Sequence, residues 1–318
     1  MIERLLNRPE LRERPPVLVD VGASGTIHPN WRPFAKYAIC VAFDADERDF
    51  HATEESGKFR TLHVFNCIVS DQSAEASDFY LTRSPHCSSL LRPYPEGLKD
   101  TAWAERFEVE RVVKLRTRAL GSVLDELGLD RVDWFKTDSQ GLDLRLFKNL
   151  GEDRLNRVLV AEFEPGLIDA YHGEDKLHAL LAYLESTRRF WLSDFVVKGS
   201  SRISPALLRQ LSPDPKVQKL LLFSLKSSPG WGELTYFNRL EDSDVSLRDR
   251  LLAYVFAVVE GQYGFALQLA LDGQQRYPND PDFGAMADFA KKKLWGRVAK
   301  IGFWPAVKTK IRQLLNQP

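Results

Sequence analysis

The first residues along the chain that could do chemistry form a glycine turn flanked by acids. Asp20-Val21-Gly22-Ala23-Ser24-Gly25 ends a short apolar run, and Asp44 and Asp46 follow the next such run. Where neighbouring strands end, a glycine turn lets the backbone approach a ligand, and an acid about 20 residues on can hold a ribose. The G-x-G-x-x-G pattern of a dinucleotide site is missing from this turn. The carboxylate of Asp20 instead favours a cationic ligand such as S-adenosylmethionine over a pyrophosphate.

The elements around this turn are predicted to alternate between strands and helices. Apolar or β-rich runs predict strands at 17–21, 38–43, 61–69, 78–82, 132–137, 157–163, 190–197 and 233–238. Helical spacing of apolar residues predicts helices at 117–128, 142–150 and 174–188. We therefore expect an α/β fold with an open, doubly wound, mostly parallel sheet and right-handed crossovers, interrupted by a proline-rich insertion at 199–231.

The sequence divides into three segments. We expect an N-terminal lead segment at 1–16, the α/β domain at 17–240 and a wholly helical region at 245–318. Within the helical region, 248–281 looks like a single tetratricopeptide-type helix pair, which needs another surface to bury its core. The remainder is a basic amphipathic tail, because eight Lys or Arg residues and no carboxylate side chain follow Asp288.

Several segments together resemble the FkbM family of S-adenosylmethionine-dependent methyltransferases. The most specific is DWFKTDSQG at 133–141, preceded by TRALGSVLDELGL. The segments VLVDVGASG at 17–25, IVSD at 68–71, FYLT at 79–82 and SSLL at 88–91 occur in the family's order. The resemblance extends over residues 15–240 and implies the Rossmann-like fold of class I methyltransferases. The glycine turn is one residue shorter than the usual family turn, and Gln140 and Asp143 stand where many members have glutamates.

The resemblance also implies which residues hold the cofactor. The turn residues Gly22, Ala23, Ser24 and Gly25 would approach the methionine part of S-adenosylmethionine, with Asp20 nearby. Asp44 would accept both ribose hydroxyls, with Asp46 as the alternative. Ser70 and Asp71 would lie at the edge of the adenine.

Methyl transfer to a hydroxyl needs an aligned acceptor oxygen and a group that takes its proton. Asp138, at the end of the strand 132–137, is predicted to be that base or to position the acceptor, and His86 is the second candidate. The residues expected to contact the acceptor are Lys136, Ser88 and Ser89. The prediction includes no metal site; a divalent metal held by Asp138, Glu162 and Glu164 is the alternative.

The predicted function is therefore an O-methyltransferase acting on a hydroxyl of a sugar, a glycan or a secondary metabolite, acceptors that are associated with the family. Two alternatives are a cofactor-binding or non-catalytic interaction protein of a polysaccharide assembly system and a nicotinamide-dependent oxidoreductase. Three cysteines without C-x-x-C spacing, and a start without a continuous apolar core, predict a cytoplasmic protein.

The charge pattern bears on partners. The chain has 44 basic and 44 acidic side chains, which argues against nucleic-acid binding by a generally basic surface. Residues 290–318 interleave cations with apolar residues that include Trp295 and Trp304. This pattern predicts peripheral contact with an anionic membrane, which for a cytoplasmic protein would be the inner face of the cell membrane. The alternatives are docking on residues 1–288, which are acidic because they hold 36 of the 44 basic and all 44 acidic side chains, or docking on a protein partner.

Overall fold

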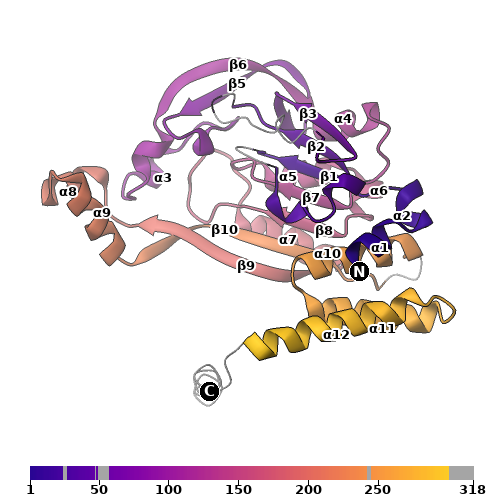
Figure 1. Cartoon of the computed structure of the whole chain (residues 1–318). Coiled ribbons are helices and arrows are strands. Elements are labelled where there is room, and N and C mark those ends of the chain that lie inside the picture. Colours follow the sequence, from indigo (N-terminus) through magenta and orange to yellow (C-terminus); the bar gives the residue numbers. More distant parts are fainter. Residues whose placement is uncertain (24–26, 47, 49–56, 242–244, 301–318) are drawn as a thin grey trace. The chain divides into compact units, whose positions relative to one another are not determined.

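The computed structural model describes residues 1–23, 27–46, 48, 57–241 and 245–300 (Figure 1). The chain forms two compact units. The larger unit is Pro15–Glu241, and the smaller consists of Met1–Arg14 together with Asp242–Pro318. The predicted site residues all belong to the larger unit, although Ser24 and Gly25 lie outside the described residues.

The larger unit is built on a seven-stranded sheet in the order β3-β2-β1-β7-β8-β10-β9. The strands are β3 (Thr61–Phe65), β2 (Ile39–Phe43), β1 (Val17–Val21), β7 (Trp134–Thr137), β8 (Val160–Phe163), β10 (Ser227–Asn238) and β9 (Phe190–Ser201). The first five strands pair in parallel, and β10 runs antiparallel to both of its neighbours. The expected open, mostly parallel α/β sheet is confirmed, and its strand order is compatible with a Rossmann-like fold.

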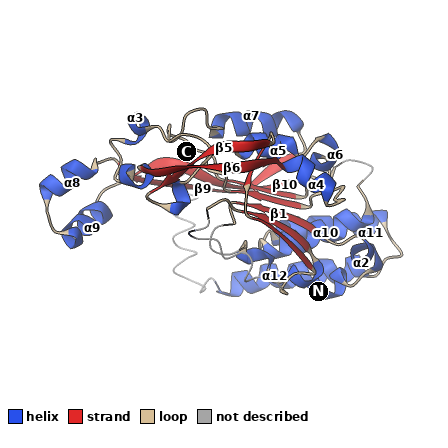
Figure 2. Cartoon of the chain, turned by 90° about the horizontal axis from the view of Figure 1, so that it is seen from above, coloured by secondary structure: helices blue, strands red, loops and turns tan. Residues whose placement is uncertain are grey.

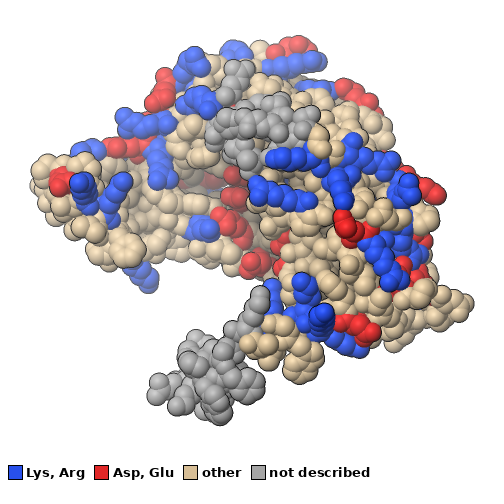
Figure 3. All heavy atoms as spheres, in the orientation of Figure 1, with Lys and Arg blue, Asp and Glu red and all other residues tan. Residues whose placement is uncertain are grey.

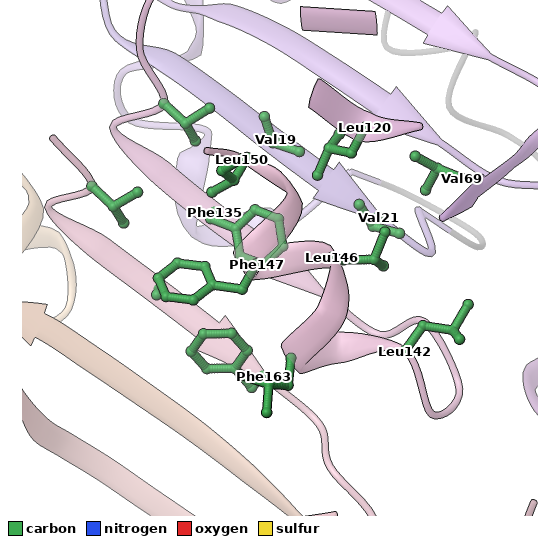
Figure 4. Close-up of a cluster of buried hydrophobic side chains, with 14 of the residues drawn as sticks. Val19, Val21, Val69, Leu120, Phe135, Leu142, Leu146, Phe147, Leu150 and Phe163 are labelled. Atoms are coloured by element: carbon green, nitrogen blue, oxygen red, sulfur yellow. The ribbon is translucent and has the colours of Figure 1, made fainter. Parts of the chain in front are cut away.

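The central strands are short and mostly apolar because both faces of the sheet are covered. All five residues of β1 are buried. On one face, α4 (Leu120–Glu126), α5 (Asp143–Asn149) and α7 (Leu177–Thr187) supply apolar side chains to a core that includes Val19 and Phe135 of the strands (Figure 4). Phe147 of α5 lies at the centre of this core, with ring centroids 5.4 Å from Phe135 and 5.1 Å from Phe163.

The connection from β1 to β2 differs from the expected alternation of strands and helices. Its described part contains two three-residue 3-10 helices, η1 (Pro29–Trp31) and η2 (Ala35–Tyr37), and no α-helix. Trp31 and Phe34 from this connection pack on Trp134 of β7 with ring centroids 6.0 Å away in both cases. Buried aromatic rings thus cover part of the sheet where a simple alternation of strands and helices would place a helix.

A second sheet of three strands lies beside the first (Figure 2). Its strands occur in the sequence between β3 and β7 of the first sheet. It consists of β4 (Ile68–Ser70), β6 (Val109–Ala119) and β5 (Ala74–Thr82) in the order β4-β6-β5. No strand was predicted where β6 lies. The helix predicted from residue 117 begins at Leu120 instead, and the strand predicted at 61–69 is two strands, β3 and β4. In Figure 3, Lys and Arg side chains lie among Asp and Glu side chains on the part of the surface where Figure 1 places β5 and β6. One such pair is Lys114 with Asp78 at 2.6 Å.

The proline-rich segment 199–231 is not wholly an insertion between strands. Both β9 and β10 are 12 residues long and pair with each other over this length, whereas β8 pairs only with residues 234–237 of β10. The two strands therefore continue beyond the main sheet as a two-stranded ribbon. At the far end of the ribbon the chain forms α8 (Pro205–Leu211) and α9 (Pro215–Ser224) (Figures 1 and 2).

Short helices complete the larger unit. They are α3 (Pro95–Leu98), α6 (Glu152–Leu155), η5 (Pro85–Cys87) and η6 (Ala104–Phe107). The element η5 carries His86, and α3 and η6 belong to a loop region that reaches the candidate site described below.

The smaller unit is helical in its described residues. Its helices are α1 (Ile2–Leu6), α2 (Pro9–Glu13), α10 (Leu247–Val259), α11 (Tyr263–Arg276) and α12 (Asp282–Lys300). The guanidinium of Arg8 lies 2.6 Å from the carboxylate of Asp280 and 2.9 Å from that of Asp282. The lead segment is thus joined to the C-terminal helices, a long-range pairing that the sequence pattern does not reveal. None of the helices in the described residues is long and apolar enough to cross a membrane.

The core of the larger unit leads to a stability prediction. Phe147→Ala should lower the free energy of unfolding by about 3–5 kcal/mol, because it removes a fully buried ring from a packed aromatic cluster. Chemical denaturation followed by fluorescence measures this change. Leu181→Ala is the matched control, because Leu181 is partly exposed on α7. This substitution should lower the free energy of unfolding by less than about 1 kcal/mol, as is usual for changes at the surface. Equal effects of the two substitutions would contradict the assigned core.

Candidate functional site

The candidate site lies where the strand order of the main sheet reverses. From β1 the chain continues to β2 and β3 on one side, and later to β7 and β8 on the other. In such sheets ligands bind beyond the carboxyl ends of the strands at this switch point. Here the loops after β1 and β7 touch, since the backbone N–H of Asp138 donates to the carbonyl of Val21 at 2.9 Å.

The glycine at the end of β1 is required by this contact. Gly22 has a φ of 78°, a conformation that favours glycine. A Cβ at this position would lie 2.3 Å from the carbonyl oxygen of Asp138. Any side chain here would therefore push the loop that carries Asp138 away from the turn.

A first pocket opens beside this turn. Its walls include the backbone of Gly22 and apolar side chains from β2, β4 and β5, among them Phe43, Val69 and Phe79. Its acidic lining residues are Asp44, Asp46 and Asp138. Among the described lining residues there is no Lys or Arg. The pocket therefore favours a ligand with positive charge and an apolar ring system.

The two acids after β2 have different surroundings. The carboxylate of Asp46 lies 2.6 Å from the guanidinium of Arg48, which also donates to the Ser88 hydroxyl at 2.9 Å. Burial raises the pKa of Asp46, but the hydrogen bonds from Arg48 outweigh it and lower the pKa overall. Asp44 accepts the backbone N–H of Asp46 at 2.8 Å through one carboxylate oxygen. Both aspartates line the pocket, but the carboxylate of Asp46 is paired with Arg48, and Asp44 comes directly after β2.

The acid before the glycine turn is placed beneath the site. Asp20 is fully buried and accepts hydrogen bonds from the backbone of His28 at 3.0 Å and from Nζ of Lys136 at 3.1 Å. Burial disfavours the charged lysine, but the carboxylates of Asp20, Asp138 and Glu164 raise the pKa of Lys136 overall. Neither Asp20 nor Lys136 is part of the described lining of the first or second pocket. Their ion pair holds the strands of the switch point together.

Other predicted contacts also lie behind the pocket walls. The Ser70 hydroxyl donates to the Asp71 carboxylate at 2.9 Å, and neither residue lines a pocket; Ile68 and Val69 of the same strand do. Ala23 is buried and donates its backbone N–H to the carbonyl of Phe43 at 3.0 Å. These residues shape the pocket without forming the described part of its surface.

A second pocket, with a volume of about 400 Å³, adjoins the first. Its lining comes from residues 84–107, 138–174, 200–202 and 228–231. Trp103 and Trp231 lie side by side in its wall with ring centroids 4.8 Å apart. His86, Asp138 and Gln140 line both pockets, so the two cavities meet at these side chains. The volume is in the range of sites for small organic ligands.

A chain of hydrogen bonds positions Asp138 at the junction. The side-chain amide of Gln140 donates to the Asp138 carboxylate, and Gln140 Oε1 lies 2.9 Å from the hydroxyl of Tyr171. The Ser89 hydroxyl donates to the backbone carbonyl of Gln140 at 2.8 Å. Gln140 has a φ of 56°, which bends the loop so that its side chain and backbone serve different partners. Ser89 thus supports the loop, whereas Ser88 lines the first pocket.

The electrostatic setting of Asp138 suits proton transfer. Burial raises its pKa, and the nearby Lys136 and the hydrogen bond from Gln140 compensate only in part. Glu164, which follows β8 and lines the second pocket, has a pKa raised to about 9 by burial and by Asp138. A carboxylate with a raised pKa is a better proton acceptor than an exposed one. Asp138 and Glu164 are thus two buried carboxyls with raised pKa values at the junction, and His86 lies exposed beside them.

Asp143 ties together the two loops that carry these acids. One carboxylate oxygen accepts from the Thr137 hydroxyl at 3.0 Å, and the other accepts the backbone N–H of Glu164 at 2.9 Å. Burial raises the pKa of Asp143 to about 6. Sequence reasoning left the role of Asp143 open and did not single out Tyr171 or Trp231. The residue Glu164 was recognisable as an acid directly after a buried strand, as Asp138 is.

The alternative metal site is not assembled from the described residues. Glu162 accepts a hydrogen bond from Nε1 of Trp134 and lies 3.2 Å from Nε2 of His28. Its carboxylate therefore belongs to the aromatic cluster on the sheet, and Asp138, Glu162 and Glu164 do not form a ligand group. This outcome argues against the set of three carboxylates as a divalent-metal site.

Comparison with known proteins did not assign the site. No protein-family model matches the chain, and no match was found among curated proteins.

The raised pKa of Glu164 leads to a prediction about pH. A carboxyl group whose pKa is raised on folding contributes stability that is complete below its ordinary pKa of 4.5 and is lost as the pH rises toward about 9. Glu164→Gln keeps a neutral side chain of the same shape. The free energy of unfolding of the native chain should therefore fall relative to that of the variant between these pH values, by up to about 1.4 kcal/mol per pH unit.

Urea denaturation at several pH values across this range measures the difference. Glu96→Gln is the control, because Glu96 lines the same pocket but is exposed, and its substitution removes the same charge. Parallel stability curves for the native chain and Glu164→Gln would show that Glu164 is not held protonated.

Proposed function

We propose that this chain is an S-adenosylmethionine-dependent O-methyltransferase of the FkbM type. The observation that carries the proposal is the meeting of two pockets at Asp138, at the switch point of the sheet. A group-transfer enzyme needs a donor site and an acceptor site that share one reacting position. Gly22 of the glycine turn and Asp44 after β2, both singled out from the sequence, line the pocket assigned to the donor.

Two features favour S-adenosylmethionine over a nicotinamide dinucleotide. Besides Asp46, which is paired with Arg48, the first pocket has Asp44 and Asp138 and no Lys or Arg in its described lining. This lining suits sulfonium and ammonium groups better than a pyrophosphate. In addition, the described part of the connection from the glycine turn to β2 contains no α-helix whose N-terminus could bind phosphate. Both features are consistent with the resemblance to methyltransferases.

The residues fit distinct roles in this reaction. S-adenosylmethionine would supply a methyl group made electrophilic by the positive sulfur. The backbone at Gly22 can approach the cofactor closely, and the Asp44 carboxylate can accept hydrogen bonds from ribose hydroxyls. Asp138 takes the proton of the acceptor hydroxyl, and Gln140 holds the carboxylate in place.

The acceptor occupies the second pocket in this proposal. A hydroxyl of a sugar, a glycan or a secondary metabolite agrees with the resemblance. The pocket's volume and the paired rings of Trp103 and Trp231 support a compact acceptor with an apolar face. The acceptor hydroxyl would point toward Asp138, where the two pockets meet.

Cofactor binding is the first test. Asp44→Ala should weaken S-adenosylmethionine binding at least tenfold, because it removes a charged hydrogen bond worth about 1.5–3 kcal/mol. Isothermal titration calorimetry measures the dissociation constant. Asp71→Ala is the control, since Asp71 lies outside the lining of both pockets and should bind with nearly native affinity. Binding of a nicotinamide dinucleotide without binding of S-adenosylmethionine would refute the proposal in favour of an oxidoreductase.

Catalysis is the second test. Asp138→Asn should reduce methyl transfer by about 10²–10⁴-fold, the usual contribution of a general base, with a much smaller loss of cofactor affinity. Transfer of a labelled methyl group to a panel of sugars and glycans measures the rate. The pH–rate profile of the variant should also lose the rise that comes from deprotonation of Asp138.

His86→Asn is the matched comparison, because His86 lines the same junction. A large loss with His86→Asn and none with Asp138→Asn would assign the proton transfer to His86 instead. Binding of S-adenosylmethionine with no transfer to any acceptor would favour a non-catalytic, cofactor-binding protein.

A further inference from the structure

The end of the β9–β10 ribbon is a helical hairpin whose two helices, α8 and α9, line neither pocket; only Arg202, before α8, reaches the second pocket. We call residues 202–226 the hairpin tip. Its two helices begin in the same way: each has a proline in the first turn, Ser204 accepts the backbone N–H of Leu207 at 3.2 Å, and Asp214 accepts that of Lys216 at 2.8 Å. Such caps fix where short helices begin. The tip is therefore a built structure rather than a long loop.

The hairpin tip exposes large apolar side chains. Leu208 faces inward and is buried, whereas Leu207 and Leu211, on another side of α8, are exposed. On α9, Leu220 is 68% exposed and Phe223, one turn further, is 92% exposed. Large exposed apolar side chains that cluster on one element mark an interaction surface. The space-filling view shows this element as a projecting, largely uncharged end with scattered Lys and Arg (Figure 3).

The few charged residues of the hairpin tip are mostly basic. Five Lys or Arg residues and a single acid, Asp214, occur between 202 and 226. The tip's arginines pair with acids of the body, Arg202 with Asp100 and Arg209 with Glu105. The lysines at 216, 219 and 226 are exposed and form no ion pair with the part of the chain that the structure describes. They are available to an external anionic surface.

We propose that the hairpin tip docks on the surface of an anionic lipid bilayer. Short helices with exposed Leu and Phe side chains and flanking lysines are suited to the bilayer interface, where rings and aliphatic chains enter the acyl boundary and lysines meet lipid phosphates. A fluid bilayer can adapt to a projecting surface, so this surface needs no partner of matching shape. A symmetric contact with a second copy would place lysine against lysine, which opposes self-association.

The position of the tip suggests why such docking is useful. The base of the same ribbon, including Ser200, Gly230 and Trp231, lines the second pocket. The Ser201 hydroxyl also donates to the carbonyl of Leu222 in α9, which links the tip to the pocket wall. A chain docked through the tip would hold its second pocket close to the bilayer. The docking itself does not rest on the proposed chemistry.

Vesicle flotation of the full chain tests this proposal. The chain should float with phosphatidylcholine vesicles that contain about one third phosphatidylglycerol, and much less with pure phosphatidylcholine. Leu220→Ser with Phe223→Ser should lower the partition coefficient at least tenfold, the factor expected when about two large apolar side chains no longer enter the bilayer. Lys216→Gln and Lys219→Gln should each lower it about fivefold on anionic vesicles.

Two controls separate this site from others. Trp295→Ser removes an exposed aromatic ring from α12, in the basic segment for which the sequence also predicts membrane contact. A loss with Trp295→Ser and none with the tip variants would overturn the proposal. So would a chain that binds no vesicles, or tip variants that only convert a dimer to a monomer in sedimentation velocity. The circular dichroism spectrum and the unfolding midpoint of each variant show that it is folded.

Discussion

The close approach of two loops at the switch point is the constraint on which the site depends. The turn after β1 and the loop after β7 are joined by a hydrogen bond from Asp138 to Val21, and only a glycine at position 22 leaves room for the Asp138 carbonyl. This contact holds the Asp138 carboxyl at the edge of the glycine turn. The first pocket lies beside it and the second adjoins the first, so a shift of this loop would change both.

Buried charges give this junction its chemical character. Beneath it, the ion pair of Asp20 and Lys136 is satisfied by short contacts, which offsets the cost of removing both charges from water. Above it, Asp138 and Glu164 share a poorly solvated region in which both carboxyls have raised pKa values. Acids in such surroundings cost stability, and proteins commonly retain them where protons are moved. The paired charges of Asp20 and Lys136 thus lie next to the carboxyls of Asp138 and Glu164, whose pKa values are raised.

The parts of the chain that extend beyond the central strands form the second pocket. The ribbon of β9 and β10 forms part of the second pocket at its base and carries apolar, basic helices at its end. The loop region 84–107 supplies the other wall, with Trp103 against Trp231 of the ribbon. The parallel core thus carries the acids that we propose as reacting groups, while extensions of the core line the second pocket and carry the proposed docking surface.

The sequence by itself determined the central strands and the acids at their ends. β1, β2, β7 and β8 are mostly buried and mostly apolar, and an acid directly after such a strand lies at the carboxyl edge of the sheet. Asp44 and Asp138 could therefore be placed from spacing alone. The strand β6 was missed because it is largely exposed and its charged residues give no apolar pattern.

Only the tertiary structure decided which of these side chains reach a pocket. Ser70, Asp71 and Lys136 occur in the segments that form the site, but neighbouring residues on a strand or turn point to different sides, and hydrogen-bond partners far along the chain select the side. Gln140 and Tyr171 meet across 31 residues of sequence because two loops converge, a contact with no local signal. Local patterns encode burial along one element, whereas a site depends on where several elements end.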